Sequence, residues 1–155
     1  MNVSGLMRKE FVRLDMTAFS KEDAIHQIAQ LARGHPNLGD FPSFCRAIYD
    51  REQAGSTSIS HGVAIPHART DQVKDLLLVV GRLVNGVKFE EKDETPVRLI
   101  FLVGTPKRMV TEYLRLVGTL ARHLHDENLR EQLLTAPDPE TLIRLFTECE
   151  SSSTA

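Results

Sequence analysis

Two apolar runs near the middle of the chain constrain the fold more than any other feature. Residues 76–84 and 97–103 are almost continuously hydrophobic. A strand of this composition is buried on both faces, which requires cover on each side of its sheet. Asn85-Gly86, directly after the first run, predicts a hairpin turn that leads into residues 87–89. The sequence therefore predicts a buried central sheet.

Helical patterns flank this sheet on both sides in the sequence. Ser20 and Asp40 have side chains that cap helix N-termini, and apolar residues follow each of them at helical spacing. The second of these helices is expected to run to about Glu52. Further helix starts are expected after Pro106, Asp126 and Asp138-Pro139. We therefore predict an α/β fold, a central mixed β-sheet with helices on both faces (an α/β/α sandwich).

Length and composition limit the organisation and the partners. A chain of 155 residues that is 41% hydrophobic suits one domain, expected over residues 1–150, with residues 151–155 as a disordered tail. Its 19 basic and 21 acidic side chains are interleaved, so no basic stripe indicates a nucleic-acid partner. Two distant cysteines indicate neither a disulfide framework nor a zinc cluster. With no signal-peptide pattern and no membrane-spanning run, we expect a cytoplasmic protein that does not insert into membranes.

Residues 56–68 form the segment most suggestive of chemistry. An apolar stretch ends there in Pro66-His67, and a proline lacks the N–H that strand pairing needs, so pairing is expected to stop and leave His67 at a strand end. An imidazole titrates near neutral pH and can attack through one nitrogen while the other holds a proton. Arg51 and Arg69 could neutralise a phosphoryl oxygen. The alternative is a strand-end histidine that bonds only to a backbone carbonyl.

The residues around His67 resemble a known signature. Arg51-Glu52, Ser56-Thr57, Ile59 and the run 62–68 are similar to the active site of the type-2 enzyme IIA domains of the bacterial phosphotransferase system (PTS), whose members include fructose, mannitol and nitrogen-regulatory forms. The resemblance extends through nearly the whole chain in family order.

The resemblance implies a phosphocarrier whose reaction needs neither a metal nor an organic cofactor. His67 would accept a phosphoryl group from a phosphorylated, HPr-like histidine carrier protein. An enzyme IIB or a regulatory protein would be the recipient. Arg51, the Thr57 hydroxyl and nearby backbone N–H groups would hold the phosphoryl oxygens.

Three residues depart from the family pattern or stand beside such a departure. Ser60 occupies a position where relatives commonly carry Gly or Ala. Tyr113 falls where many carry a second histidine, and a tyrosine can donate a hydrogen bond there but holds no positive charge near neutral pH. His61, six residues before His67, either compensates locally or is a solvated side chain; if strand geometry persisted, both histidines would share a face.

The sequence leaves two functions open. A phosphocarrier with a nitrogen-related, regulatory output is favoured over a sugar-dedicated one because the chain appears as a lone domain. The alternative is a non-catalytic regulatory or sensor module of enzyme-IIA type, which binds a partner such as a transporter or kinase without phosphoryl transfer. Absence of the second histidine is the feature that favours this module.

Overall fold

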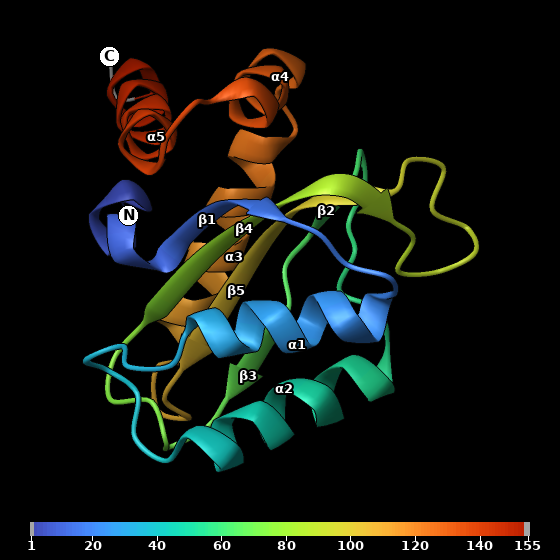
Figure 1. The fold of residues 1–155 in the computed structure, drawn as a ribbon. Helices are drawn as coiled ribbons and strands as arrows, with labels where there is room; N and C mark the ends of the chain where they lie inside the picture. Colours follow the sequence, from blue (N-terminus) through green and yellow to red (C-terminus); the bar gives the residue numbers. More distant parts are fainter. Residues whose placement is uncertain (1, 154–155) are drawn as a thin grey trace.

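The computed structural model describes residues 2–153 and is built around one mixed sheet (Figure 1). The strands run along the sheet in the order β1-β4-β5-β2, and β3 also pairs with β5. All pairings are parallel except that of β4 with β5. The strands are β1 (Val12–Met16), β2 (Val63–Ala64), β3 (His67–Arg69), β4 (Leu77–Val87) and β5 (Val97–Thr105).

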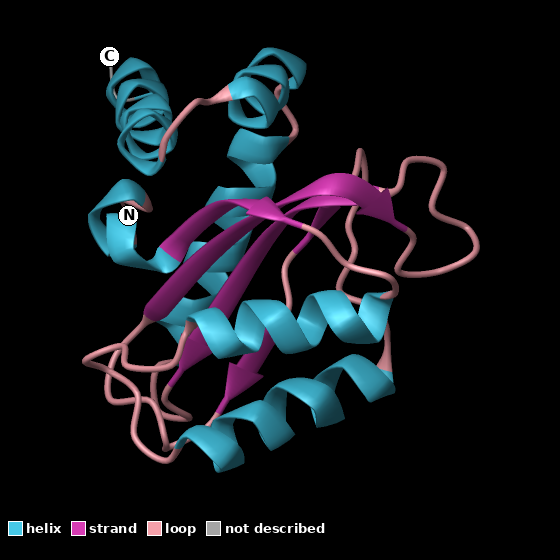
Figure 2. Ribbon diagram, in the orientation of Figure 1, coloured by secondary structure: helices cyan, strands magenta, loops and turns pink. Residues whose placement is uncertain are grey.

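Helices cover both faces of the sheet, as predicted (Figure 2). Side chains of the first two helices pack on one face, and side chains of the last three pack on the other. The helices are α1 (Lys21–Leu31), α2 (Phe41–Ala54), α3 (Val110–Leu124), α4 (Glu127–Thr135) and α5 (Pro139–Ser153), and two short 3₁₀ helices, η1 (Ser4–Leu6) and η2 (Lys9–Phe11), precede β1.

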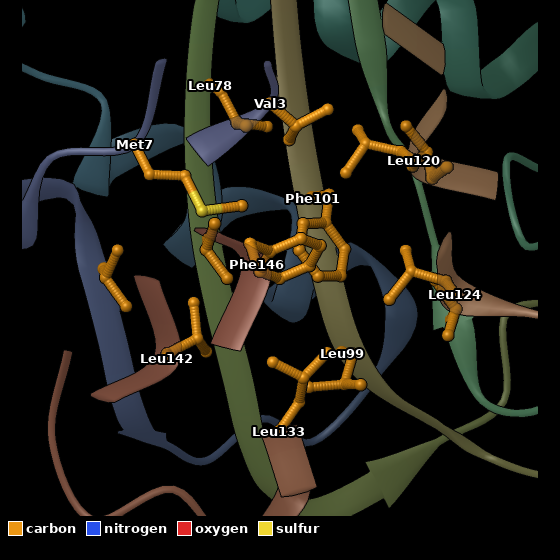
Figure 3. Packing of buried hydrophobic residues seen from close by; sticks show 14 of the residues in the cluster. Val3, Met7, Leu78, Leu99, Phe101, Leu120, Leu124, Leu133, Leu142 and Phe146 are labelled. Carbon is orange, nitrogen blue, oxygen red and sulfur yellow. The ribbon is translucent and has the colours of Figure 1, made fainter. Parts of the chain in front are cut away.

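Alternate residues of the central strands explain why these strands are hydrophobic throughout. Leu78 and Phe101 point into the core shared with α3 and α5, whereas Leu77 and Ile100 point into the core shared with α1 and α2. Figure 3 shows Phe101 facing Phe146 of α5, with ring centroids 5.8 Å apart. The sheet is therefore held rigidly between two helical layers, and loops at its edges can carry a site.

Capping bonds confirm four of the predicted helix starts, and the helix expected after Pro106 begins at Val110 without a side-chain cap. Ser20 Oγ accepts the Asp23 N–H at 3.1 Å, and Asp40 Oδ2 accepts the Ser43 N–H at 3.0 Å. Asp126 and Asp138 cap α4 and α5 in the same way. These local signals were sufficient because each bond satisfies a helix N–H that has no partner within the helix.

The predicted hairpin turn at Asn85-Gly86 is wrong. Strand β4 continues through these residues to Val87, and residues 88–96 make the connection to β5. The amide of Asn85 donates to Ala18 O at 3.0 Å, and Gly86 packs so closely on Pro96 that an added Cβ would lie 2.5 Å from the proline Cβ. These tertiary contacts keep an extended conformation at a dipeptide that favours a tight turn.

The ends of the chain also differ from expectation. Strand β1 lies at the sheet edge beside β4 and was not predicted. At the other end, α5 includes residues 151–153, where the sequence predicts a disordered tail; residues 154–155 lie outside the described part. The N-terminal segment is tied to α5, because Glu150 accepts the N–H groups of Val3 and Ser4 at 2.6 and 2.9 Å. Contacts between the two ends therefore order both of them.

Candidate active site

His67 is the first residue of β3 rather than an unpaired strand end. Strand β2 stops at Ala64, as the proline predicts, but pairing with β5 resumes at once after Pro66. Pro66 lacks an N–H yet still contributes its carbonyl, which accepts the Val103 N–H at 2.9 Å. Pairing with β5 thus holds the backbone of His67, and its half-buried ring is positioned by the sheet.

The hydrogen bonds of the imidazole define its tautomer. Arg51 Nε lies 3.1 Å from His67 Nε2, and a guanidinium can only donate, so Nε2 must carry the lone pair. The proton of the neutral ring is then on Nδ1, which donates to Ile65 O at 3.0 Å. The nitrogen that faces the guanidinium is therefore the nucleophilic one, and the other nitrogen is held by the backbone.

The surroundings lower the pKa of His67 below its ordinary value. Burial has the largest effect, because it disfavours the charged imidazolium, and the Arg51 cation acts in the same direction. The bond to Ile65 O and the Glu52 carboxylate oppose the shift without cancelling it. The ring is consequently neutral near pH 7, which is the form that can attack an electrophile.

Arg51 comes from the last turn of α2 and bridges that helix to the site. Besides its contact with His67, its Nη1 donates to Gly55 O at 2.8 Å, just beyond the helix end. A cation at a helix C-terminus is favourable in itself, so the stabilising role and a role beside His67 coexist. The guanidinium is held where anionic oxygens on Nε2 would meet it.

Tyr113 packs against His67, with ring centroids 5.3 Å apart and ring planes inclined by 46°. It lies in the first turn of α3, whose apolar face places it beside β3. Burial raises the pKa of the phenol, while Arg51 and Arg69 oppose that shift. The hydroxyl therefore remains protonated near pH 7 and can donate a hydrogen bond. Exposed Arg69 donates to Lys107 O at 3.3 Å.

The structure does not direct the Thr57 hydroxyl toward His67. Thr57 Oγ1 donates to Glu52 Oε2 at 2.6 Å, and its N–H donates to Glu52 Oε1 at 3.0 Å. Lys21 Nζ lies 3.1 Å from the same Oε1. The sequence predicted that the Thr57 hydroxyl binds a phosphoryl oxygen directly. In the structure this hydroxyl instead donates to the buried Glu52 carboxylate. Sequence reasoning missed Glu52 and Lys21 as site residues, and the only available signal was the position of Glu52 beside Arg51 in the signature.

Ser60 and His61 lie in a turn, and His61 does not share a strand face with His67. His61 has a φ of 58°, and Gly62 follows with a φ of 78°, so the predicted alternation between the two histidines is wrong. The His61 ring instead lies 6.0 Å from that of His125. Ser60 and His61 line a pocket of about 310 Å³ together with acidic residues of the 88–96 connection, including Glu90 and Asp93.

Residues 2–153 contain no group of three or more His, Cys, Asp or Glu side chains placed to hold a metal ion. Within the same range, the helices are too short or too polar for any of them to cross a bilayer.

Comparison with known families decides what this site belongs to. The family model described as "Phosphoenolpyruvate-dependent sugar phosphotransferase system, EIIA 2" matches residues 5–149. The chain belongs to this family. The resemblance inferred from the signature is thereby confirmed, and a phosphocarrier domain of the PTS is favoured over the non-catalytic module.

Individual EIIA relatives come from both functional branches. The fructose-specific EIIA component of Haloferax volcanii is 29% identical, with 95% of this chain and 96% of the relative covered. The nitrogen regulatory protein of Klebsiella oxytoca is 30% identical, with 100% and 96% covered. The chain spans only 23% of the fructose-specific EIIABC component of Bacillus subtilis, at 29% identity. This EIIA therefore matches the Haloferax and Klebsiella relatives along nearly their whole length.

Solved structures agree with the predicted fold class. The nitrogen regulatory protein IIA-Ntr of Neisseria meningitidis superposes with a TM-score of 0.85 at 28% identity, covering 93% of this chain and 98% of that one. The mannitol IIA of Escherichia coli gives a TM-score of 0.79 at 23% identity, covering 90% and 98%. The α/β architecture of this EIIA is thus shared across the family.

Proposed function

We propose that His67 Nε2 accepts a phosphoryl group from the phosphohistidine of an HPr-like carrier protein. The observation that carries this proposal is the fixed tautomer. Because Nδ1–H is held by Ile65 O and Nε2 faces a permanent donor, the ring presents one unprotonated nitrogen beside a cation. That combination suits a group that receives a phosphoryl group, because the nucleophile and the countercharge are placed before the donor arrives.

The transfer exchanges one nitrogen–phosphorus bond for another. The Nε2 lone pair attacks phosphorus, the P–N bond of the donor breaks, and its electron pair returns to the donor imidazole. Arg51 must leave the lone pair for this to happen, and its N–H groups then donate to the phosphoryl oxygens. Tyr113 supplies a neutral donor on another side of the ring. In the product, Nδ1–H remains on Ile65 O and stabilises the charge on the phosphorylated ring.

Arg51 and Tyr113 are therefore the proposed supporting residues, whereas the hydroxyl of Thr57 is bound to Glu52 and is not proposed to touch the phosphoryl group. Ser60 and His61 line the neighbouring turn, where they are proposed to meet the partner rather than the phosphoryl group. The contacts of each side chain support this assignment, and a substitution at each position can test it.

We further propose a regulatory output of the nitrogen-related type for the phosphorylated protein, which would act in the cytoplasm. Support comes from the match to the Klebsiella nitrogen regulatory protein along nearly all of its length and from the Neisseria IIA-Ntr structure. Relay to an enzyme IIB is the second candidate. One related structure is the complex of Escherichia coli enzyme IIA mannitol with phosphorylated IIB mannitol, which shares the fold at a TM-score of 0.80 and 21% identity.

The direct test is incubation of the protein with phosphorylated HPr, followed by ³¹P NMR and intact-mass measurement. An acid-labile, alkali-stable adduct of one phosphoryl group is expected on the wild type and not on His67→Gln. Addition of an enzyme IIB domain then separates the two outputs, because only a relay protein loses the adduct to it. A correctly folded wild type that stays unmodified would contradict the proposal.

A further inference from the structure

Glu52 is a buried carboxylate that lies next to the site and forms hydrogen bonds with Thr57 rather than with His67 itself. Its side chain follows Arg51 at the end of α2 and is 8% exposed. Three donors surround it: the N–H and the hydroxyl of Thr57, and the ammonium of Lys21. A carboxylate can only accept, so a residue of this type is suited to three converging donors. These contacts of the Glu52 carboxylate join α1, α2 and the segment that precedes β2.

A continuous series of hydrogen bonds leads from this carboxylate to the imidazole. Thr57, held at its N–H and its hydroxyl, accepts the Ile65 N–H on its carbonyl at 3.0 Å. Ile65 in turn accepts His67 Nδ1–H at 3.0 Å. The position of the Ile65 carbonyl decides which nitrogen of His67 keeps the proton. Glu52 therefore lies at the start of the series that holds the reactive tautomer.

We propose that Glu52 is a positioning residue, which fixes the orientation and tautomer of His67 through Thr57 and the Ile65 carbonyl. This inference rests on the proposed function, phosphoryl acceptance at Nε2. Glu52 acts through other residues and does not touch the phosphoryl group. Its neighbour Arg51 anchors the same segment at Gly55 O, so two consecutive residues of α2 hold both ends of the stretch from Gly55 to Thr57.

The test substitution is Glu52→Gln, with Glu150→Gln as the matched control. The amide keeps the size of the side chain but removes the charge, and a donor NH₂ replaces one of the two acceptor oxygens, so the side chain no longer accepts from the Thr57 N–H and the Thr57 hydroxyl through separate oxygens. Glu150 is also a buried carboxylate, 7% exposed, that accepts two backbone N–H groups, but it lies in the helical layer on the other face. Both variants lose similar local bonding, and only the first is connected to His67.

Phosphorylation by phosphorylated HPr is measured in single turnover at pH 7. We expect about a tenfold lower rate for Glu52→Gln, which corresponds to about 1.4 kcal/mol and is the size of one hydrogen bond lost from the series that holds the ring. Glu150→Gln is expected to stay within about twofold of the wild type, because Glu150 is not connected to His67. A twofold change corresponds to about 0.4 kcal/mol at about 1.4 kcal/mol per tenfold.

An NMR titration of His67 distinguishes positioning from general loosening. The charged or titratable groups that face the ring are Arg51, Glu52 and Tyr113. Glu52 and the Ile65 carbonyl both raise the pKa of His67, so weakening them lowers that pKa further. A merely loosened site would admit water, relieve the burial that lowers the pKa, and raise it instead. The ¹⁵N shifts of the ring report the tautomer directly.

The outcomes separate this inference from the proposed function. A Glu52→Gln protein with wild-type rate, pKa and tautomer would overturn the positioning role. If the wild type accepts no phosphoryl group but the pKa of His67 still falls in the variant, the proposed function fails and the positioning role stands. If Glu52→Gln does not fold, Thr57→Val and Thr57→Ser decide: the valine is expected to lose more activity than the serine, which keeps the donor, and equal rates would overturn the inference.

Discussion

Replacement of Arg51 by glutamine tests the electrostatic half of the site. Arg51 Nε lies 3.1 Å from the nitrogen that would bond to phosphorus, so phosphoryl oxygens on Nε2 come within reach of its donors. One hydrogen bond to a charged group is worth about 1.5–3 kcal/mol. At about 1.4 kcal/mol per tenfold in rate, loss of this interaction slows transfer by roughly 10- to 100-fold.

The same substitution has a second effect with a definite sign. Burial is the main cause of the lowered His67 pKa, and the Arg51 cation lowers it further. Without that cation the pKa rises toward its ordinary value, so less of the neutral nucleophile is present near pH 7. Arg51→Lys keeps a charge but not the planar fork, and we expect it to fall between the wild type and the glutamine variant.

Rapid-quench measurement of single-turnover transfer from phosphorylated HPr supplies the rate, and NMR titration supplies the pKa. Arg46→Gln is the matched control, because Arg46 is an exposed arginine on the same helix, near its start. It is expected to behave as the wild type. If Arg51→Gln transferred as fast as Arg46→Gln, the assignment of Arg51 as a phosphoryl ligand would be refuted.

Three further predictions concern the tyrosine, the pH dependence of stability and a turn glycine. Tyr113→Phe removes one neutral donor worth about 1 kcal/mol and is expected to slow transfer about fivefold in the rapid-quench assay, and an unchanged rate would restrict Tyr113 to packing. Burial lowers the pKa values of His35, His67 and His123 in the folded protein, so the unfolded chain takes up protons at a higher pH than the folded protein does. The free energy of unfolding should therefore fall as the pH drops below the ordinary histidine pKa of 6.5. A urea-denaturation free energy that stays constant from about pH 7 to about pH 5 would contradict this prediction. Gly62→Ala, at a φ of 78° with a carbonyl oxygen 2.8 Å from the added Cβ, should cost about 2 kcal/mol or more in chemical denaturation, and a cost below about 0.5 kcal/mol would show that the turn relaxes.

Local chemistry accounts for what sequence reasoning predicted correctly about the fold. Ser20, Asp40, Asp126 and Asp138 start their helices because a side-chain oxygen meets a backbone N–H within three residues. The central apolar runs indicate two buried faces for an equally local reason. By contrast, the extended conformation at Asn85-Gly86 depends on Ala18, which is far away in the sequence, and on Pro96, the last residue of the connection to β5. No neighbouring residue signals those contacts.

The candidate site likewise has features that the sequence predicts and features that depend on the tertiary structure. His67 stands out in the sequence because Pro66 and the small residues before it form a recognisable pattern, and Arg51 belongs to that pattern. The pairing of His67 with β5, its fixed tautomer and its lowered pKa depend on burial and on atoms brought together by the fold. The same is true of Glu52, whose buried carboxylate takes the Thr57 hydroxyl that the sequence assigned to the phosphoryl group.

The sequence by itself therefore determined the family, the α/β layers, the helix starts and the choice of His67 as the candidate reactive residue. These signals are periodicity, capping and a contiguous motif, and each depends on residues that are close together in the sequence. Only the tertiary structure decided which nitrogen of that histidine is free and which side chains face it. Those properties arise from donors and acceptors on α1, α2, β3 and α3, and their distances exist only once the sheet and its helices have packed together.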